Sequence, residues 1–279
     1  MRLPILLLAA AALLSAGGVG ALALVQRRLI YPGAYGEAAP AGDRAVPPGA
    51  AAITLETADG ERLYALWRAP RPGCGVVVSF HGNASLPEYH AERFVADPWA
   101  AAGWGVLAPA YRGYPGSTGA PSEDGLIADG LAAVAAARAR APGAPILLHG
   151  HSLGAAVAVA VAARLPAGAF AGLYLEAPFD SMVSAARVHV PAAPGWLLRD
   201  TYRSDLRIVG LSGPILIVHG TDDPVVPERL GRRLAEAGRA RFEAIPGDHV
   251  SILGARDGEA AALFGAARAC PDAAAAAAR

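Results

Sequence analysis

Short apolar runs alternate with helical patterns along most of this chain. The runs are continuous, which is typical of strands buried on both faces of a sheet. They lie at residues 76–80, 104–108, 146–148, 173–175, 215–218 and 242–245. Helical patterns cover residues 88–102, 123–140, 155–164 and 252–268, and Ser122 is the expected N-cap of the second helix.

Two alternating segments precede the first apolar run. Residues 53–57 and 63–67 flank Asp59-Gly60, a dipeptide typical of tight turns, and predict an antiparallel β-hairpin. Strands that alternate with helices predict a parallel sheet covered on both faces. We therefore expect an α/β fold with a mostly parallel central sheet, helices on both faces and an antiparallel hairpin at its start.

The N-terminal segment is apolar enough to span a membrane. Residues 5–25 carry no charge over 21 positions and are flanked by Arg2 on one side and by Arg27 and Arg28 on the other. We favour an uncleaved transmembrane helix, a single-span anchor. The alternative is a cleaved signal segment ending near Ala21-Leu22-Ala23, which would make the domain secreted or periplasmic. The flanking charges leave both sides of the membrane open for the domain.

These patterns divide the chain into four regions. We assign residues 1–28 to the membrane anchor or signal segment, and residues 29–51, rich in Pro, Gly and Ala, to a linker or surface loop. Residues 52–270 form the α/β domain, and residues 271–279 form a disordered tail.

Composition narrows the choice of partners. Lys+Arg and Asp+Glu both number 24, so no basic surface is expected and we predict no nucleic-acid partner. Cys74 and Cys270 have no His or Cys neighbour at metal-ligand spacing. A disulfide between them is formally open, but we favour a pair of free thiols.

The sharpest candidate for chemistry is Gly150-His151-Ser152-Leu153-Gly154. This run stands between a predicted strand and a predicted helix, where Gly-x-Ser-x-Gly is typical of a strained turn that exposes a nucleophilic serine. The helix that begins after Ser152 directs its dipole and the Leu153 N–H toward an oxyanion formed there.

A nucleophilic serine needs a histidine to take its proton and a carboxylate to orient that histidine. In hydrolases with this type of sheet the chain order is Ser, acid, His, and the site lies beyond the carboxyl ends of the strands. We assign Ser152 as nucleophile and His249, the only histidine after the acidic pair, as base. For the acid we prefer Asp223 to Asp222, which is explained as a turn residue.

The loop after residue 80 is the expected source of a second oxyanion donor. Gly82 allows a close backbone approach, and we assign the N–H groups of Asn83 and Leu153 to the oxyanion hole. His81 is open as a second base, but we favour a buried structural histidine bonded to loop backbone.

Longer runs resemble a known family. The Gly-His-Ser-Leu-Gly run is similar to that of the α/β-hydrolase superfamily. The runs at 80–84, 111–114, 116–119 and 121–126, and the basic, aromatic stretch 26–32, resemble the Bem46 / abhydrolase-domain 12–13–17 group. The resemblance covers about residues 25–265. Ala110 and Pro115 replace the Asp and Gly usual in the group around Tyr-Arg-Gly-Tyr, so we expect different packing of that loop.

The resemblance implies an α/β-hydrolase fold. The segment between Phe179 and Pro214 is too short for a large separate cap, so we expect a short cap at residues 180–213. The resemblance also implies a serine hydrolase that cleaves a carboxylic ester or thioester of the acyl-lipid or acyl-protein type through an acyl-enzyme on Ser152, with a small-molecule or lipid acyl substrate as its partner. No metal or organic cofactor is required. The apolar cap residues are explained equally well as an acyl pocket or as core packing: Met182, Val188, Trp196, Leu197 and Tyr202.

Two alternatives stay open at this point. A peptidase or acyl-aminoacyl hydrolase needs acidic cap residues that bind a peptide N-terminus, and the candidates are Asp180, Asp200 and Asp205. A non-catalytic scaffold with this fold is less favoured, because such proteins typically lose a triad member and this chain keeps a candidate for all three.

Overall fold

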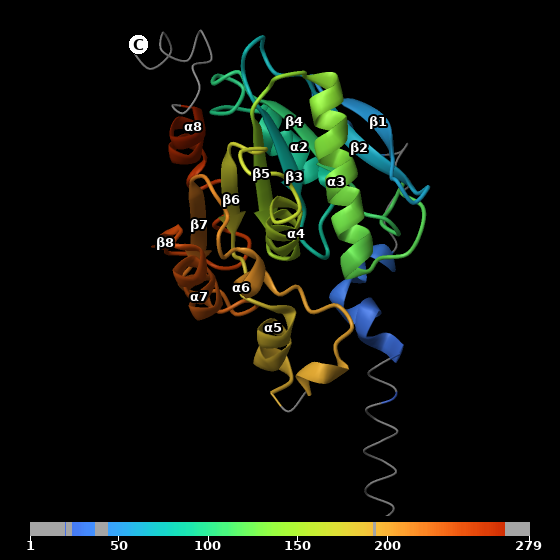
Figure 1. Cartoon of the computed structure of the whole chain (residues 1–279), viewed down its shortest axis with the longest axis vertical. Coiled ribbons are helices and arrows are strands. Elements are labelled where there is room, and N and C mark those ends of the chain that lie inside the picture. Colours follow the sequence, from blue (N-terminus) through green and yellow to red (C-terminus); the bar gives the residue numbers. More distant parts are fainter. Residues whose placement is uncertain (1–19, 21–23, 37–43, 192–193, 266–279) are drawn as a thin grey trace, which may run out of the picture.

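The fold is built on an eight-stranded sheet with the order β1-β2-β4-β3-β5-β6-β7-β8 (Figure 1). The computed structural model describes residues 20, 24–36, 44–191 and 194–265. Only the pairings of β2 with β1 and β4 are antiparallel; the others are parallel. The strands are β1 (Ala51–Glu56), β2 (Arg62–Arg68), β3 (Val76–Phe80), β4 (Gly105–Pro109), β5 (Ile146–His151), β6 (Gly172–Glu176), β7 (Ile215–Gly220) and β8 (Arg241–Ile245). The predicted α/β-hydrolase architecture is confirmed.

Helices cover both faces of this sheet because its central strands are apolar on both sides. Val76 and Val78 point into one core with α3, α4 and α7, while Val77 points into a second core with α2 and α8. The helices are α2 (Pro87–Val95), α3 (Glu123–Arg140), α4 (Leu153–Ala162), α5 (Met182–His189), α6 (Ser204–Arg207), α7 (Glu228–Gly238) and α8 (Asp257–Gly265).

Two helices are shorter than their patterns predicted. The pattern at 88–102 gives α2, which ends at Val95 shortly before Pro98; proline has no N–H to continue a helix. The pattern at 252–268 gives α8, which begins only at Asp257, since Gly254 adopts φ +79° in the preceding turns.

A helix at residues 24–30 packs against the cap. Arg27 pairs with buried Asp200 at 2.9 Å, and the hydroxyls of Tyr31 and Tyr202 are hydrogen-bonded at 3.0 Å. Tyr31, inside the segment predicted as a linker or surface loop, is fully buried. Tyr31 is followed by the short helix η1 (Pro32–Ala34), and Asp200 is preceded by the short helix η3 (Gly195–Leu197).

The predicted membrane span falls mostly outside the described residues. Residues 5–19 and 21–23 belong to that part of the chain, as does the predicted tail at 271–279. Within the described ranges, every helix is too short or too polar to cross a bilayer.

Cys74 corrects one expectation. The expectation of a free thiol is wrong for Cys74, which is disulfide-bonded, and the described part of the chain contains no free cysteine. The side chain is buried, 3% exposed, just before β3. The free-thiol expectation rested on the separation of the cysteines along the chain, which does not determine their separation in the fold.

Candidate active site

Ser152 lies on a sharp turn between β5 and α4. Its backbone has φ 55° and ψ −115°, a conformation that costs free energy for a residue with a side chain. The flanking glycines make this turn possible. A Cβ on Gly150 would lie 2.2 Å from the Gly154 carbonyl oxygen, and one on Gly154 would lie 2.0 Å from that of Phe80. A hydrogen bond to the neighbouring strand β6 also stabilises the turn: the Ser152 N–H donates to the Glu176 carbonyl oxygen at 2.9 Å.

His249 and Asp223 meet beyond β7 and β8. The distance between His249 Nδ1 and Asp223 Oδ2 is 2.7 Å, and Asp223 Oδ1 accepts from the N–H groups of Val225 and Val226 at 2.8 Å. Burial alone would raise the pKa of Asp223, but hydrogen bonds from His219, His249 and the Val226 N–H outweigh burial and lower it. An ionised carboxylate only accepts, so His249 Nδ1 carries the proton and Nε2 is left as the basic nitrogen.

His151 joins the serine turn to the histidine loop. Its Nε2 donates to the His249 carbonyl oxygen at 2.9 Å, and the two ring centroids lie 4.8 Å apart. Burial lowers the pKa of His151 to about 4, so this ring is neutral at physiological pH. Within the described residues no hydrogen bond joins the Ser152 hydroxyl to His249. The sequence did not predict this role of His151, because the position between Gly and Ser in the Gly-x-Ser-x-Gly motif can hold any residue.

Asn83 and Leu153 present free N–H groups. Neither donates a hydrogen bond to any residue in the described part of the chain; for Leu153 this follows from its place at the first position of α4, where helical N–H groups lack partners. His81, next to this loop, is buried with Nδ1 2.8 Å from the Gly82 carbonyl oxygen. Burial lowers the pKa of His81 to about 4.

Two tyrosines hold the loop that carries Asn83. The Tyr111 hydroxyl donates to the His81 carbonyl oxygen at 2.9 Å, and the Tyr114 hydroxyl donates to that of Asn83 at 2.7 Å. From the N-terminal segment, the Gly33 N–H donates to the same Asn83 oxygen at 3.1 Å. The backbone on both sides of the candidate oxyanion donor is therefore fixed by groups from two other parts of the chain.

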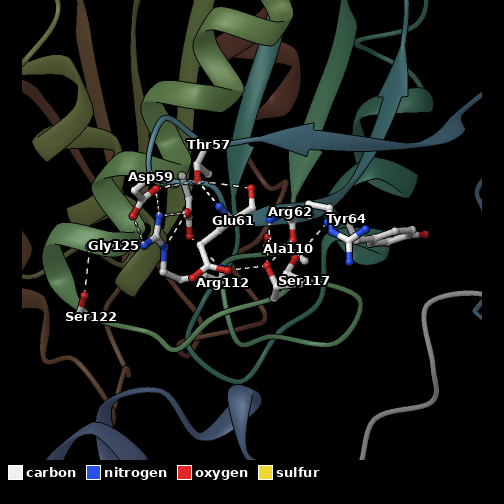
Figure 2. A network of polar contacts seen from close by, with 12 residues as sticks. Thr57, Asp59, Glu61, Arg62, Tyr64, Ala110, Arg112, Ser117, Ser122 and Gly125 are labelled. Carbon is white, nitrogen blue, oxygen red and sulfur yellow. Dashed lines mark hydrogen bonds and ion pairs between the residues drawn. The ribbon is translucent and has the colours of Figure 1, made fainter.

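The loop at residues 110–117, which carries Tyr111 and Tyr114, is itself bound to the β1–β2 hairpin (Figure 2). The Arg112 guanidinium binds Asp59 at 2.7 and 3.0 Å on one side and buried Asp129 at 2.8 Å on the other. The Ser117 hydroxyl donates to the Ala110 carbonyl oxygen and accepts from the Tyr64 N–H. Ala110, where the resembled group has Asp, is bound here through its backbone.

A buried ionic cluster lies beneath the site. The Glu176 carboxylate, fully buried at the end of β6, accepts from Arg93, from His149 Nε2 at 2.9 Å and from the Gly254 N–H at 3.0 Å. Burial would raise the pKa of Glu176, but the positive charge of Arg93 outweighs it and holds the pKa well below its ordinary value. Glu176 thereby links the strand beside Ser152 to the loop that follows His249. The only sequence signal for it was a glutamate closing an apolar run.

The cap residues divide between packing and exposure. Met182, Val188 and buried Tyr202 pack on the core, whereas Trp196 is 78% exposed. A separate pocket of about 460 Å³ lies next to the catalytic candidates, since its lining includes Ala84, which follows Asn83, and Val250, which follows His249. Its other lining residues are Ser85, Tyr89, His90, Arg93 and Leu253.

Comparison with known proteins agrees with this architecture. A family model described as "Serine aminopeptidase, S33" matches residues 71–203. An uncharacterized protein of Mycobacterium tuberculosis, MT2364, is 38% identical over 244 residues, which cover 85% of this chain and 84% of that protein. The lysophosphatidylserine lipase ABHD12 of Macaca fascicularis is 33% identical over 180 residues, covering 57% of this chain and 44% of its own length.

The fold is also that of solved enzymes. The esterase Pf2001 of Pyrococcus furiosus superimposes with a TM-score of 0.62 at 19% identity, over 78% of this chain and 88% of that one. Fold, serine turn and relatives agree: the chain is a serine hydrolase with the α/β-hydrolase fold, it belongs to the same family as the Mycobacterium tuberculosis protein MT2364, and it resembles the ABHD proteins over about half of their length or less.

Proposed function

We propose that this enzyme cleaves a carboxylic ester or thioester through an acyl-enzyme intermediate on Ser152. His249 Nε2 takes the proton of the Ser152 hydroxyl as Oγ attacks the acyl carbon, and Asp223 stabilises the resulting imidazolium. The N–H groups of Asn83 and Leu153 bind the oxyanion. His249 then returns the proton to the leaving alcohol or thiol, and a water molecule, activated by the same histidine, releases the acid.

The observation that carries this proposal is the 2.7 Å hydrogen bond between His249 Nδ1 and the lowered-pKa carboxylate of Asp223. It leaves Nε2 basic, on a loop whose His249 carbonyl oxygen accepts a hydrogen bond from His151, the residue before the nucleophile. Because a bound, ionised acid and a neutral histidine are what a serine hydroxyl needs, the pair supports base-assisted acyl transfer.

An acyl substrate is supported by the pocket beside the catalytic candidates. A volume of about 460 Å³ is within the range of small-molecule sites. Tyr89, Val250 and Leu253 give it an apolar lining that suits a hydrocarbon chain. Lipid and lysophospholipid esters are therefore the substrate class we propose; the ABHD12 relative is named a lysophosphatidylserine lipase.

The peptidase alternative receives less support. A subsite for a peptide N-terminus needs an acidic side chain free to bind an ammonium group. Asp180, Asp200 and Asp205 pair with Arg233, Arg27 and Arg203, respectively. We therefore expect p-nitrophenyl esters to be turned over in preference to aminoacyl anilides.

We also propose the uncleaved N-terminal segment as a membrane anchor. One support is the uncharged run at residues 5–25. The other is the packing of residues 26–31 against the domain, because cleavage near Ala23 would have to occur immediately before a folded helix.

A labelling experiment tests the chemistry. Wild-type protein should react with a fluorophosphonate probe and hydrolyse p-nitrophenyl esters, and Ser152→Ala should do neither while keeping its circular dichroism spectrum and melting temperature. The matched control is Ser181→Ala, a cap serine that is buried and is the N-cap of α5. A folded wild-type protein that never labels would refute the assignment of Ser152.

A further inference from the structure

The helix at residues 24–30 turns an apolar face away from the domain. Gln26 and Ile30 are buried against the domain, 3% and 8% exposed. Leu24, Val25 and Leu29 are 80%, 42% and 64% exposed. With 3.6 residues per turn, Leu24 and Val25 lie on the side of the helix away from the buried pair, and Leu29 lies between Val25 and Gln26 around the helix. The arrangement is unusual for a helix on a water-soluble surface, where the outer face is polar.

Trp196 is a further exposed apolar side chain, on the cap segment that the helix contacts. It belongs to η3 and is 78% exposed. Gln26 fastens the helix to this segment, because its Nε2 donates to the Leu197 carbonyl oxygen at 3.2 Å and its Oε1 accepts from the Arg199 N–H at 2.8 Å. Figure 1 shows the helix and η3 at the same end of the molecule. We call Leu24, Val25, Leu29 and Trp196 together the outer face.

A phospholipid bilayer is the occupant that fits the outer face. Leu24 and Val25, the first two residues of the face, are also the last two residues of the uncharged run at 5–25. Arg28 is exposed on the same side of the helix, where its guanidinium lies 5.6 Å from the Tyr35 ring. Tryptophan and arginine beside aliphatic side chains are the residue types that favour the headgroup layer.

We propose that the outer face lies in the headgroup layer of a phospholipid bilayer, so that the cap end of the enzyme rests on the membrane. Exposed apolar surface of this kind is unfavourable in water and favourable at the edge of the hydrocarbon layer. The contact is built from the N-terminal helix and the cap jointly. It therefore fixes the orientation of the domain, which a flexible tether would leave free. The proposal rests on the proposed membrane anchor and does not depend on the chemistry at Ser152.

Tryptophan quenching tests this orientation in the full-length protein. The chain has four tryptophans. Trp99 and Trp104 are buried, and Trp67 is half-buried against the core. The protein is reconstituted into liposomes of phosphatidylcholine with a minority of phosphatidylglycerol, using lipids brominated either near the glycerol or near the chain end. We expect loss of emission with the shallow bromines and little with the deep ones. This loss should disappear in Trp196→Phe and remain in the matched variant Trp67→Phe.

Three outcomes would overturn the proposal. The first is Trp196 emission that the shallow bromines leave unchanged while acrylamide in the water phase quenches it. In the second, emission follows the protein-to-lipid ratio and ignores bromine, which would indicate a second copy of the chain on this face. The third is protein that does not float with the liposomes. None of these readings requires enzymatic activity, so a failure here is distinguishable from a failure of the proposed reaction.

Discussion

The N–H of Gly33 donates to the carbonyl oxygen of Asn83 across 3.1 Å. This bond connects the segment that follows the N-terminal helix to the loop proposed to bind the oxyanion. Gly33 has no room for a side chain, because a Cβ would lie 2.6 Å from Tyr114 Cε1 and 2.8 Å from the Asn83 oxygen.

Gly33→Ala should therefore lower kcat by displacing the Asn83 loop. Full loss of one oxyanion donor costs about 100- to 1000-fold, which is the upper limit of the expected effect. The measurement is kcat and KM on a soluble p-nitrophenyl ester, with KM expected to change little. Gly36→Ala is the control in the same segment, since its Cβ would meet only the Pro32 oxygen at an ordinary 3.6 Å. Equal kinetics for the two variants would contradict a role for Gly33.

Tyr114→Phe removes the second hydrogen bond to the Asn83 oxygen and leaves the ring in place. A neutral hydrogen bond contributes about 1 kcal/mol, so we expect kcat to fall about fivefold. Tyr35→Phe, a half-exposed tyrosine near the same segment, should behave as wild type. If Tyr114→Phe raised KM and left kcat unchanged, its hydroxyl would be acting on substrate binding instead.

Asp223→Asn should nearly abolish turnover. The amide can donate to His249 Nδ1 and favour the wrong tautomer, and the corresponding change in a serine protease lowers kcat about 10⁴-fold. Asp222→Asn provides the control, because the Asp222 carboxylate is exposed and accepts only from the Thr221 hydroxyl among the described residues. Its activity should stay within a few-fold of wild type. A larger loss in Asp222→Asn than in Asp223→Asn would reverse the assignment of the acid.

Stability should fall as the pH is lowered from 6.5 toward 4. Burial lowers the pKa of His81 and His151 to about 4, and also lowers those of His90 and His149 below the ordinary 6.5. In this window the unfolded chain binds protons that the folded chain does not. The free energy of unfolding therefore drops with falling pH, by at most about 1.4 kcal/mol per pH unit for each histidine that stays neutral in the folded chain.

One group opposes this trend. Burial raises the pKa of Asp129 to about 6, so its carboxyl takes up a proton in the folded state first and offsets one histidine. Melting temperatures measured at intervals between pH 7 and 4.5 should show the net loss. His151→Gln should make the dependence shallower, and a flat profile in wild type would be inconsistent with neutral buried histidines.

Glu176→Gln should destabilise the fold strongly. It removes the carboxylate that Arg93 and His149 share in a buried cluster, and breaking a buried ion pair typically costs about 3–5 kcal/mol. Urea unfolding measures the loss. Glu243→Gln is the comparison, since this glutamate pairs with Arg241 and Arg256 near the surface and should contribute about 1 kcal/mol or less. Comparable losses in the two variants would argue against a central role for the cluster.

The sequence was most informative about the candidate catalytic residues that directly follow predicted strands. Ser152, Asp223 and His249 each follow an apolar run, and parallel strands bring such positions to one edge of the sheet. This local rule placed the three in one region, and the structure adds the bond between Asp223 and His249.

Contacts across the fold were not predictable in the same way. The approach of Tyr31 to Tyr202 joins positions 171 residues apart, and neither carries a periodic signal. The support of Asn83 by Tyr114 and Gly33 depends on how three loops meet, which no local pattern encodes. The disulfide at Cys74 was missed for the same reason.

The contacts between the N-terminal helix and the cap have a mechanical consequence. Any force applied through the N-terminal end of the chain reaches the Arg27–Asp200 and Tyr31–Tyr202 contacts before it reaches a strand. The cap bears the load first, and the eight strands behind it are shielded until those contacts break. A pull on the N-terminal end of the chain would therefore act on the cap before it acts on the turn that holds Ser152.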